Sequence, residues 1–315
     1  MGNSPMSLDP RALASLKGLH LRARQIVEGY MVGLHRSPLR GFSIEFAEHR
    51  EYSPGDDIRH VDWKVFGRTD KFYVKQYEDE TNLICYLVLD VSESMAYQGP
   101  GSAMSKLEYA RCLIAAFSWL VLQQQDAVAL ATIGEQVQDR LRPASHPSQW
   151  DNVLRVLEGV TPSGTTRMGS TLHELAERYR KRGIVIILSD LFTDVDELIA
   201  GLRHFGHRRH DVVLLEVLDP AELDFPFQRF SRFQGLEQLG SLLADPAAIR
   251  TAYRAELEAA RNQVQQEVRK LGMEWVSVRT DTPFDVAMRE FLGARESRGA
   301  MGGVAPGGPR TSCDR

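Results

Sequence analysis

The chain reads LICYLVLDVSES from Leu83 to Ser94. The first seven residues of this stretch are all apolar, as expected of a strand that is covered on both faces of a parallel sheet. A carboxylate and two hydroxyls follow directly, at Asp90, Ser92 and Ser94. Ligands of open parallel sheets bind at the carboxyl ends of the strands, so we expect these three side chains to converge there.

Strands and helices alternate on the C-terminal side of this stretch. Ser105-x-x-Glu108 is a capping box and predicts the start of a helix. Apolar periodicity predicts further elements: strands over 127–133, 184–188, 212–218 and 275–278, and helices near 148–159, 169–182, 194–205, 246–271 and 283–292. This alternation predicts an α/β fold, a Rossmann-like parallel sheet wrapped by helices.

The rest of the chain divides into shorter parts. Asp9-Pro10 is typical of a helix start, and apolar residues at helical spacing predict one helix over about 10–29. We therefore expect four parts: an N-terminal helix in 1–39, a segment of turns and short strands over 40–80, the α/β domain over 81–293, and a disordered tail over 294–315 rich in Gly, Pro, Ser and Arg.

Composition narrows the class of protein. The 315 residues are 43% hydrophobic and 25% charged with a net charge of -4, which indicates an ordinary globular protein and argues against nucleic-acid binding. Three cysteines without a CxxC pair are typical of a reducing compartment. The longest apolar stretch, Cys112 to Leu122, is too short to span a bilayer. We expect a cytoplasmic protein without a membrane span.

Two later loops are placed to complete a metal site with Asp90, Ser92 and Ser94. The loop over 163–169 precedes a helix, and Asp190 follows the strand over 184–188, so both belong at the same edge of the sheet. Taken singly, each is ordinary cap or turn chemistry. Together they form an oxygen-only set, which Mg2+ or Mn2+ prefers.

The DxSxS element, the Gly-Thr loop and the later strand-end Asp resemble the metal-ion-dependent adhesion site of von Willebrand factor A-type domains. The resemblance implies that Ser92, Ser94 and Thr165 offer hydroxyls to Mg2+ while Asp90 and Asp190 hold its water molecules. The Thr loop has one extra residue, which leaves Thr166 as the alternative to Thr165. Leu191 stands where the family usually has Gly.

The segment before the sheet carries a second resemblance. Its RxYxPGDDxRxxDW run from Arg50 to Trp63 resembles the signature of domain-of-unknown-function family 58, and the two resemblances together cover about residues 40–293. Alternating charges around an aromatic stabilise turn-rich units by ion pairs, which is one interpretation. The other is a partner surface, because these are residue types of interface hot spots. The candidates for it are Arg50, Asp56, Asp57, Arg59, Asp62, Trp63 and Arg68.

The resemblances imply a protein-binding function. Family 58 is similar in arrangement to proteins that work beside MoxR-type AAA+ ATPases, which remodel or activate other complexes. A bound Mg2+ would keep one coordination position open to an Asp or Glu of a partner. We expect a non-catalytic, Mg2+-dependent adaptor or co-chaperone whose partners are a MoxR-type ATPase and a client protein that presents an acidic side chain.

An enzyme and a scaffold are the alternatives to a binding function. A metal-dependent hydrolase or phosphotransfer enzyme using Asp90 is the alternative, although an aspartyl-phosphate enzyme would place a second acid where Ser92 stands. The usual P-loop, GxGxxG, HExxH and GxSxG elements are missing from the sequence. A scaffold with a vacant metal site is a further alternative. The histidines at 204, 207 and 210 span Gly206, a helix breaker, and are not expected to share one face as a metal site.

Overall fold

A computed structural model describes residues 8–35, 49–51, 73–75, 83–235 and 240–292. The chain divides into two compact units, Met1–Gly33 with Leu83–Arg315, and Leu34–Asn82. In the second unit, β1 (His49–Glu51) and β2 (Tyr73–Lys75) pair antiparallel. For Arg50 the structure describes only the backbone, in β1. The other candidates for a partner surface lie outside the described residues: Asp56, Asp57, Arg59, Asp62, Trp63 and Arg68.

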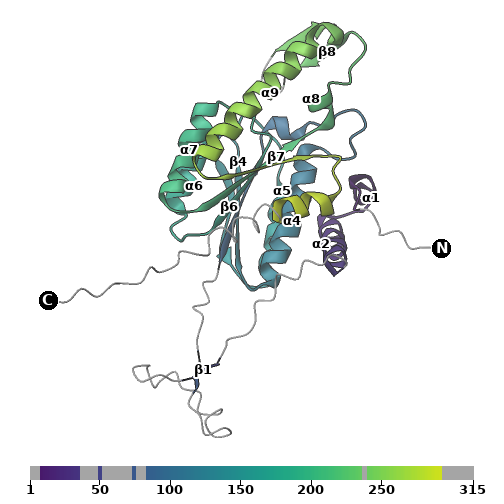
Figure 1. The fold of residues 1–315 in the computed structure, drawn as a ribbon. Helices are drawn as coiled ribbons and strands as arrows, with labels where there is room; N and C mark the ends of the chain where they lie inside the picture. Colours follow the sequence, from purple (N-terminus) through teal and green to yellow (C-terminus); the bar gives the residue numbers. More distant parts are fainter. Residues whose placement is uncertain (1–7, 36–48, 52–72, 76–82, 236–239, 293–315) are drawn as a thin grey trace, which may run out of the picture. The chain divides into compact units, whose positions relative to one another are not determined.

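Six strands form the sheet of the larger unit, in the order β10-β7-β6-β3-β4-β5 (Figure 1). They are β3 (Ile84–Asp90), β4 (Ala127–Ile133), β5 (Val137–Ala144), β6 (Ile184–Ser189), β7 (Asp211–Leu218) and β10 (Glu274–Arg279). All neighbours are parallel except β4 and β5. The predicted α/β fold with a parallel sheet is confirmed, and β3 lies inside it between β4 and β6.

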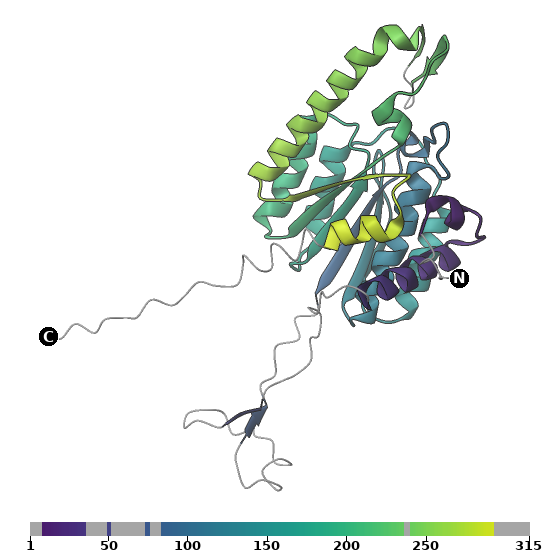
Figure 2. The same cartoon turned by 45° about the vertical axis from the view of Figure 1, so that its right-hand side comes forward.

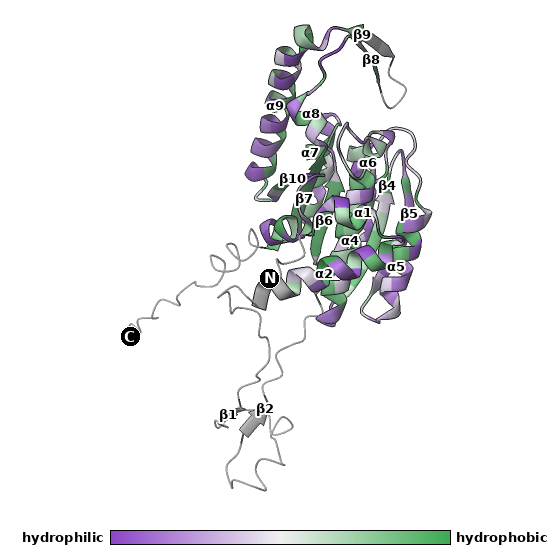
Figure 3. Cartoon of the chain, turned by 90° about the vertical axis from the view of Figure 1, so that its right-hand side faces the viewer, coloured by the Kyte–Doolittle hydropathy of each residue, from purple (hydrophilic) through white to green (hydrophobic). Residues whose placement is uncertain are grey.

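Helices cover both faces of this sheet. On one face, α6 (Met168–Arg178), α7 (Val195–His207) and α9 (Pro246–Lys270) enclose a core with alternate strand residues such as Tyr86 and Val88. On the other face lie α4 (Lys106–Gln123) and α5 (Ser148–Gly159), with a last helix over 284–292. The strands between the layers are mostly hydrophobic in Figure 3, which is why their sequences are continuous apolar runs.

The N-terminal helix differs from the expectation of one helix over 10–29. The structure has two, α1 (Pro10–Ala14) and α2 (Leu19–His35). Gly18 between them has a φ of +94°, a left-handed conformation that ends a helix and suits glycine. Arg22 donates hydrogen bonds to the carbonyl of Ala14, the last residue of α1, and to that of Leu16 in the turn between the helices.

Between β7 and β10 the chain leaves the sheet and returns. This excursion contains α8 (Pro220–Asp224), β8 (Ser231–Gln234), β9 (Ser241–Ala244) and α9. Figures 1 and 2 show α9 running past the sheet, with the β8–β9 pair at its far end. The helix is held to the sheet by its C-terminal half, where Val264 and Val268 are buried. In the part of the chain that the structure describes, every helix is too short or too polar to cross a membrane.

Two glycines let α6 and α7 approach closely. A Cβ added at Gly169 would lie 2.7 Å from the carbonyl oxygen of Glu197, and one at Gly201 would lie 3.0 Å from the carbonyl oxygen of Gly169. Backbone atoms cannot yield unless a whole helix shifts. We expect Gly169→Ala to lower the free energy of unfolding by about 1–3 kcal/mol, as overpacking does, when measured by chemical denaturation.

Gly159→Ala is the matched control for this variant. Gly159 is the last residue of α5, and a Cβ there would meet nothing within 4 Å. We expect an unchanged or slightly higher stability, because alanine restricts the unfolded chain more than glycine does. Equal stability of the two variants would contradict the close approach of α6 and α7.

Candidate functional site

Three segments meet at the carboxyl edge of the sheet. Asp90 ends β3, and Asp190 follows β6, the parallel neighbour of β3. The loop before α6 is tied to the turn after β3, because the Glu93 amide donates to the carbonyl of Gly164 at 2.9 Å. The Ser163 amide donates to the carbonyl of Val91 at 3.0 Å. The segments that the sequence placed at one edge are therefore adjacent in space.

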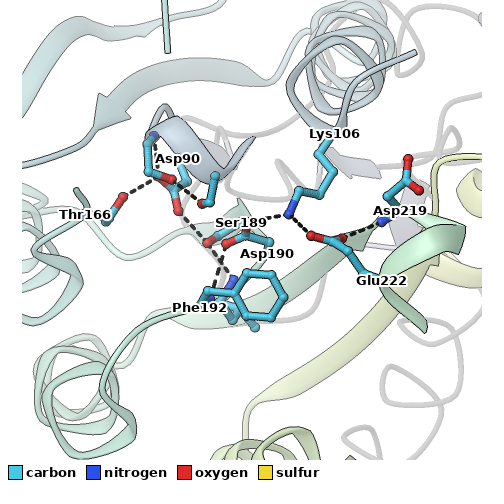
Figure 4. A network of polar contacts seen from close by, with 11 residues as sticks. Asp90, Lys106, Thr166, Ser189, Asp190, Phe192, Asp219 and Glu222 are labelled. Atoms are coloured by element: carbon cyan, nitrogen blue, oxygen red, sulfur yellow. Dashed lines mark hydrogen bonds and ion pairs between the residues drawn. The ribbon is translucent and has the colours of Figure 1, made fainter. Parts of the chain in front are cut away.

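The carboxylate of Asp90 lies at the centre of these contacts (Figure 4). It is 2% exposed. Its Oδ1 accepts hydrogen bonds from the Ser92 amide at 2.9 Å and from the Thr166 hydroxyl at 2.6 Å. Its Oδ2 accepts from the Ser189 hydroxyl at 2.6 Å. One carboxylate thus joins the turn after β3, the loop before α6 and the end of β6.

The electrostatic setting disfavours negative charge on this carboxylate. Burial, reinforced by the charge of Asp190, raises the pKa of Asp90 to about 6, against three hydrogen bonds that lower it. Two carboxylates in a buried position repel each other, and a cation between them removes this repulsion.

The structure places several of the hydroxyls that the sequence assigned to a metal site. Ser92 and Ser94 are buried with their Oγ atoms 2.9 Å apart, so these hydroxyls do converge. In the loop, Thr166 contacts Asp90, whereas the assignment from the resemblance was Thr165. Thr166, the alternative that the extra loop residue left open, is thus the loop hydroxyl that contacts Asp90.

Sequence reasoning gave Ser189 no role, although it is completely buried against Asp90. Its Oγ also accepts a hydrogen bond from the Leu191 amide at 2.9 Å. Leu191 has a φ of +59°, a left-handed conformation in which glycine is the usual residue. Its side chain is buried in the core, and this packing offsets the strain of the conformation.

A second residue without an assigned role is Lys106, in the first turn of α4. Its side chain is 0% exposed, and its Nζ lies 2.7 Å from Asp190 Oδ2 and 2.6 Å from Glu222 Oε1. Burial opposes the charge of Lys106, but the two carboxylates outweigh it, and the pKa lies above its ordinary value. A cation in the first turn of a helix opposes the helix dipole, and this local conflict is the signal that could have identified it.

The contacts of Lys106 extend the site to α8. Asp219 caps this helix by accepting from the Ala221 amide at 2.8 Å, and Glu222 accepts from the Asp219 amide at 2.8 Å. Asp219 also accepts from the Gly99 amide at 2.9 Å. Polar contacts therefore run from Asp190 through Lys106 to the start of the excursion between β7 and β10, and they meet the contacts of Asp90 at the adjacent residues Ser189 and Asp190 (Figure 4).

The three histidines do not form a site of their own. His210 is buried and pairs with the carbonyl of Tyr179 at 3.0 Å, while the ring of His204 packs edge-on against His173. Within the described ranges, no three His, Cys, Asp or Glu side chains are grouped to hold a metal ion. A metal at the sheet edge would therefore depend on the hydroxyls as well as on the two aspartates.

The sequence of the chain is similar to those of known proteins. The family model described as "Protein of unknown function DUF58" matches residues 48–265. Uncharacterized protein Mb1516 of Mycobacterium bovis and Uncharacterized protein Rv1480 of Mycobacterium tuberculosis are each 28% identical to the chain over 301 residues, covering 94% of the chain and 93% of each relative.

Solved structures are also similar to the chain. The conserved hypothetical protein BatB from Bacteroides thetaiotaomicron has 17% identity and a TM-score of 0.48, covering 70% of this chain and 99% of that one. The VWA domain of SpRpn10 has 11% identity and a TM-score of 0.39, covering 66% of this chain and 94% of that one.

Proposed function

The chain belongs to the DUF58 family and has an α/β fold with a mostly parallel sheet, and we propose that it is a Mg2+-dependent protein-binding module. The observation that carries the proposal is the convergence of hydroxyls beside two buried carboxylates at the carboxyl edge of the sheet. It is the edge at which open α/β sheets bind their ligands.

The donor set fits a hard divalent cation. Each side chain that we propose as a metal ligand offers an oxygen atom, which suits Mg2+ or Mn2+ better than zinc. Ser92, Ser94 and Thr166 would contact the ion through their hydroxyls. Asp90 and Asp190 already accept hydrogen bonds from protein donors, so these carboxylates would act on the ion through water molecules. When bound, the ion would supply a coordination position for a carboxylate oxygen of a partner.

The surface beside the carboxylates indicates what a partner would present. Phe192, two residues after Asp190, is 43% exposed. An acidic side chain with an apolar neighbour would place its carboxylate at the metal edge and its apolar group on the ring of Phe192. We propose an acidic client and a MoxR-type AAA+ ATPase as the partners, and the family resemblance supports the second. The three cysteines of the sequence, without a CxxC pair, support a reducing compartment, and the proposal places the chain in the cytoplasm.

Affinity capture tests the proposed function. The immobilised full chain is incubated with the purified ATPase, and separately with cell lysate, in Mg2+ and in chelator. We expect the ATPase and a small set of clients to bind in Mg2+ only. Capture that is identical in both buffers would contradict a Mg2+-dependent module.

The proposal also predicts an absence of turnover. The sequence has no P-loop and no GxSxG element, and both oxygens of Asp90 accept hydrogen bonds from the protein itself. We expect the purified chain to hydrolyse ATP and p-nitrophenyl phosphate no faster than its Asp90→Asn variant. A Mg2+-dependent rate that disappears in this variant would favour the hydrolase alternative.

A further inference from the structure

Lys106 is a buried cation beside a site that is itself proposed to bind a cation. A fully buried ammonium loses its hydration, which its ion pairs must offset. An apolar side chain of the same length would avoid this loss but would leave the buried carboxylates of Asp190 and Glu222 without a cation. The charge of Lys106 therefore balances two carboxylates, one of which belongs to the proposed metal site.

The ammonium shares Asp190 with the proposed metal site. It contacts Oδ2 of this carboxylate at 2.7 Å, while Oδ1 accepts from the Phe192 amide at 3.2 Å. Its other ion pair, at 2.6 Å, is with Glu222, which lies outside the proposed donor set. Any cation bound near Asp190 would be repelled by Lys106 and attracted by Glu222.

The charges of the network show the consequence. The network contains four carboxylates, Asp90, Asp190, Asp219 and Glu222, against the single ammonium of Lys106. A bound divalent cation and the ammonium of Lys106 do not fully neutralise the four carboxylates, so the net charge stays negative. Without the ammonium, this net charge would be more negative. Since like charges repel, a partner's carboxylate approaches the loaded edge more easily when the ammonium is present.

We propose that Lys106 determines the ligand preference of the metal edge: it weakens binding of the free cation and strengthens binding of a carboxylate to the cation-loaded edge. The inference rests on the proposed function, because it assumes that the edge binds Mg2+. The ammonium lies 4.8 Å from the centre of the ring of Phe192, the exposed residue on which a partner's apolar group would pack. Lys106 is a positioning residue, since it acts through Asp190 and through its charge.

The test uses variants with opposite expected signs. Lys106→Met removes the positive charge at similar length and is expected to raise Mg2+ affinity roughly 10-fold. Glu222→Gln removes a negative charge at similar shape and is expected to lower Mg2+ affinity by a similar factor. The double variant is expected to return close to the wild-type affinity. Calorimetry of the full chain gives these values, and chemical denaturation without metal gives the stability of each variant.

Arg261→Met is the matched control. Arg261 forms an ion pair at 2.6 Å with the buried Glu216 of β7, in the same fold but outside the network of Lys106. We expect this variant to be less stable than the wild type and to keep its Mg2+ affinity. If Lys106 had only a structural role, Lys106→Met and Glu222→Gln would both lower stability and neither would raise the affinity for Mg2+.

A second readout measures the carboxylate preference directly, with acetate as the probe. Titration of the Mg2+-saturated protein, followed by NMR, is expected to show at least a threefold weaker affinity for acetate in Lys106→Met. If the wild type binds Mg2+ and Lys106→Met binds it equally or more weakly, the inference about Lys106 is overturned and the proposed function is not. A wild type that binds no Mg2+ would overturn the proposed function together with the inference. If Lys106→Met does not fold, an unchanged Mg2+ affinity in Glu222→Gln is the result that overturns it.

Discussion

Asp90→Asn is expected to lower Mg2+ affinity by about 100-fold, the upper range for groups that act on a metal through its water molecules. Asp90 is the carboxylate on which all three segments of the edge converge, through Ser92, Thr166 and Ser189. Asparagine keeps the size and one acceptor oxygen but removes the charge. Calorimetry should show one ion per wild-type chain, because one converging donor set is proposed.

Asparagine is a better replacement than alanine at this position. Alanine would leave two hydroxyls and an amide without their acceptor in a buried place, and unsatisfied buried donors cost stability. Asparagine keeps one acceptor oxygen, so we expect Asp90→Asn to lose less stability than Asp90→Ala in the absence of metal, as measured by chemical denaturation.

Asp126→Asn is the control for the loss of a carboxylate. Asp126 accepts a hydrogen bond from the Leu83 amide at 3.1 Å, at the opposite end of β3 from Asp90. Its replacement should leave Mg2+ affinity unchanged. Equal Mg2+ affinities in the wild type and in Asp90→Asn would remove Asp90 from the metal site.

Thr166→Val is expected to weaken association with the MoxR-type ATPase at least tenfold, and chelation of Mg2+ should have the same effect. Valine has the shape of threonine without the hydroxyl that donates to Asp90 at 2.6 Å. Loss of a metal bridge to a partner carboxylate should cost more binding free energy than the ~0.2–1 kcal/mol that an exposed ion pair typically contributes. Surface plasmon resonance with the purified ATPase measures the change.

Thr165→Val is the matched control, one residue earlier in the same loop. If the hydroxyl of Thr165 faces the ion instead, this variant and not Thr166→Val will lose the partner. Full binding by both variants and in chelator would show that the interface lies elsewhere. The segment from Arg50 to Arg68 would then be the next candidate.

Several elements of this fold follow from local patterns. The apolar runs of β3, β4, β6 and β7 predict buried parallel strands, because a strand covered on both faces has no polar side. The capping box at Ser105 and Glu108 is present and begins α4 as expected. Both signals depend on residues a few positions apart, so they can be recognised without the tertiary structure.

Other elements have weak local patterns and were not predicted. The edge strand β5 reads VQDRLRPA, in which polar residues and a proline obscure the alternation. The strands β8 and β9 have four residues each and pair only with one another. The break between α1 and α2 depends on the φ of Gly18, in a stretch whose apolar spacing continues across the break.

For the candidate site, the sequence by itself determined that Asp90, Ser92, Ser94 and Asp190 would lie at one edge, because strand ends follow from strand assignments. Which other side chains reach them depends on the folding of distant loops. Thr166 and Ser189 are 76 and 99 residues from Asp90, and Lys106 is 84 residues from Asp190. These contacts arise where the crossovers of a parallel sheet bring distant loops together, and the choice among neighbouring hydroxyls depends on backbone geometry that no local pattern specifies.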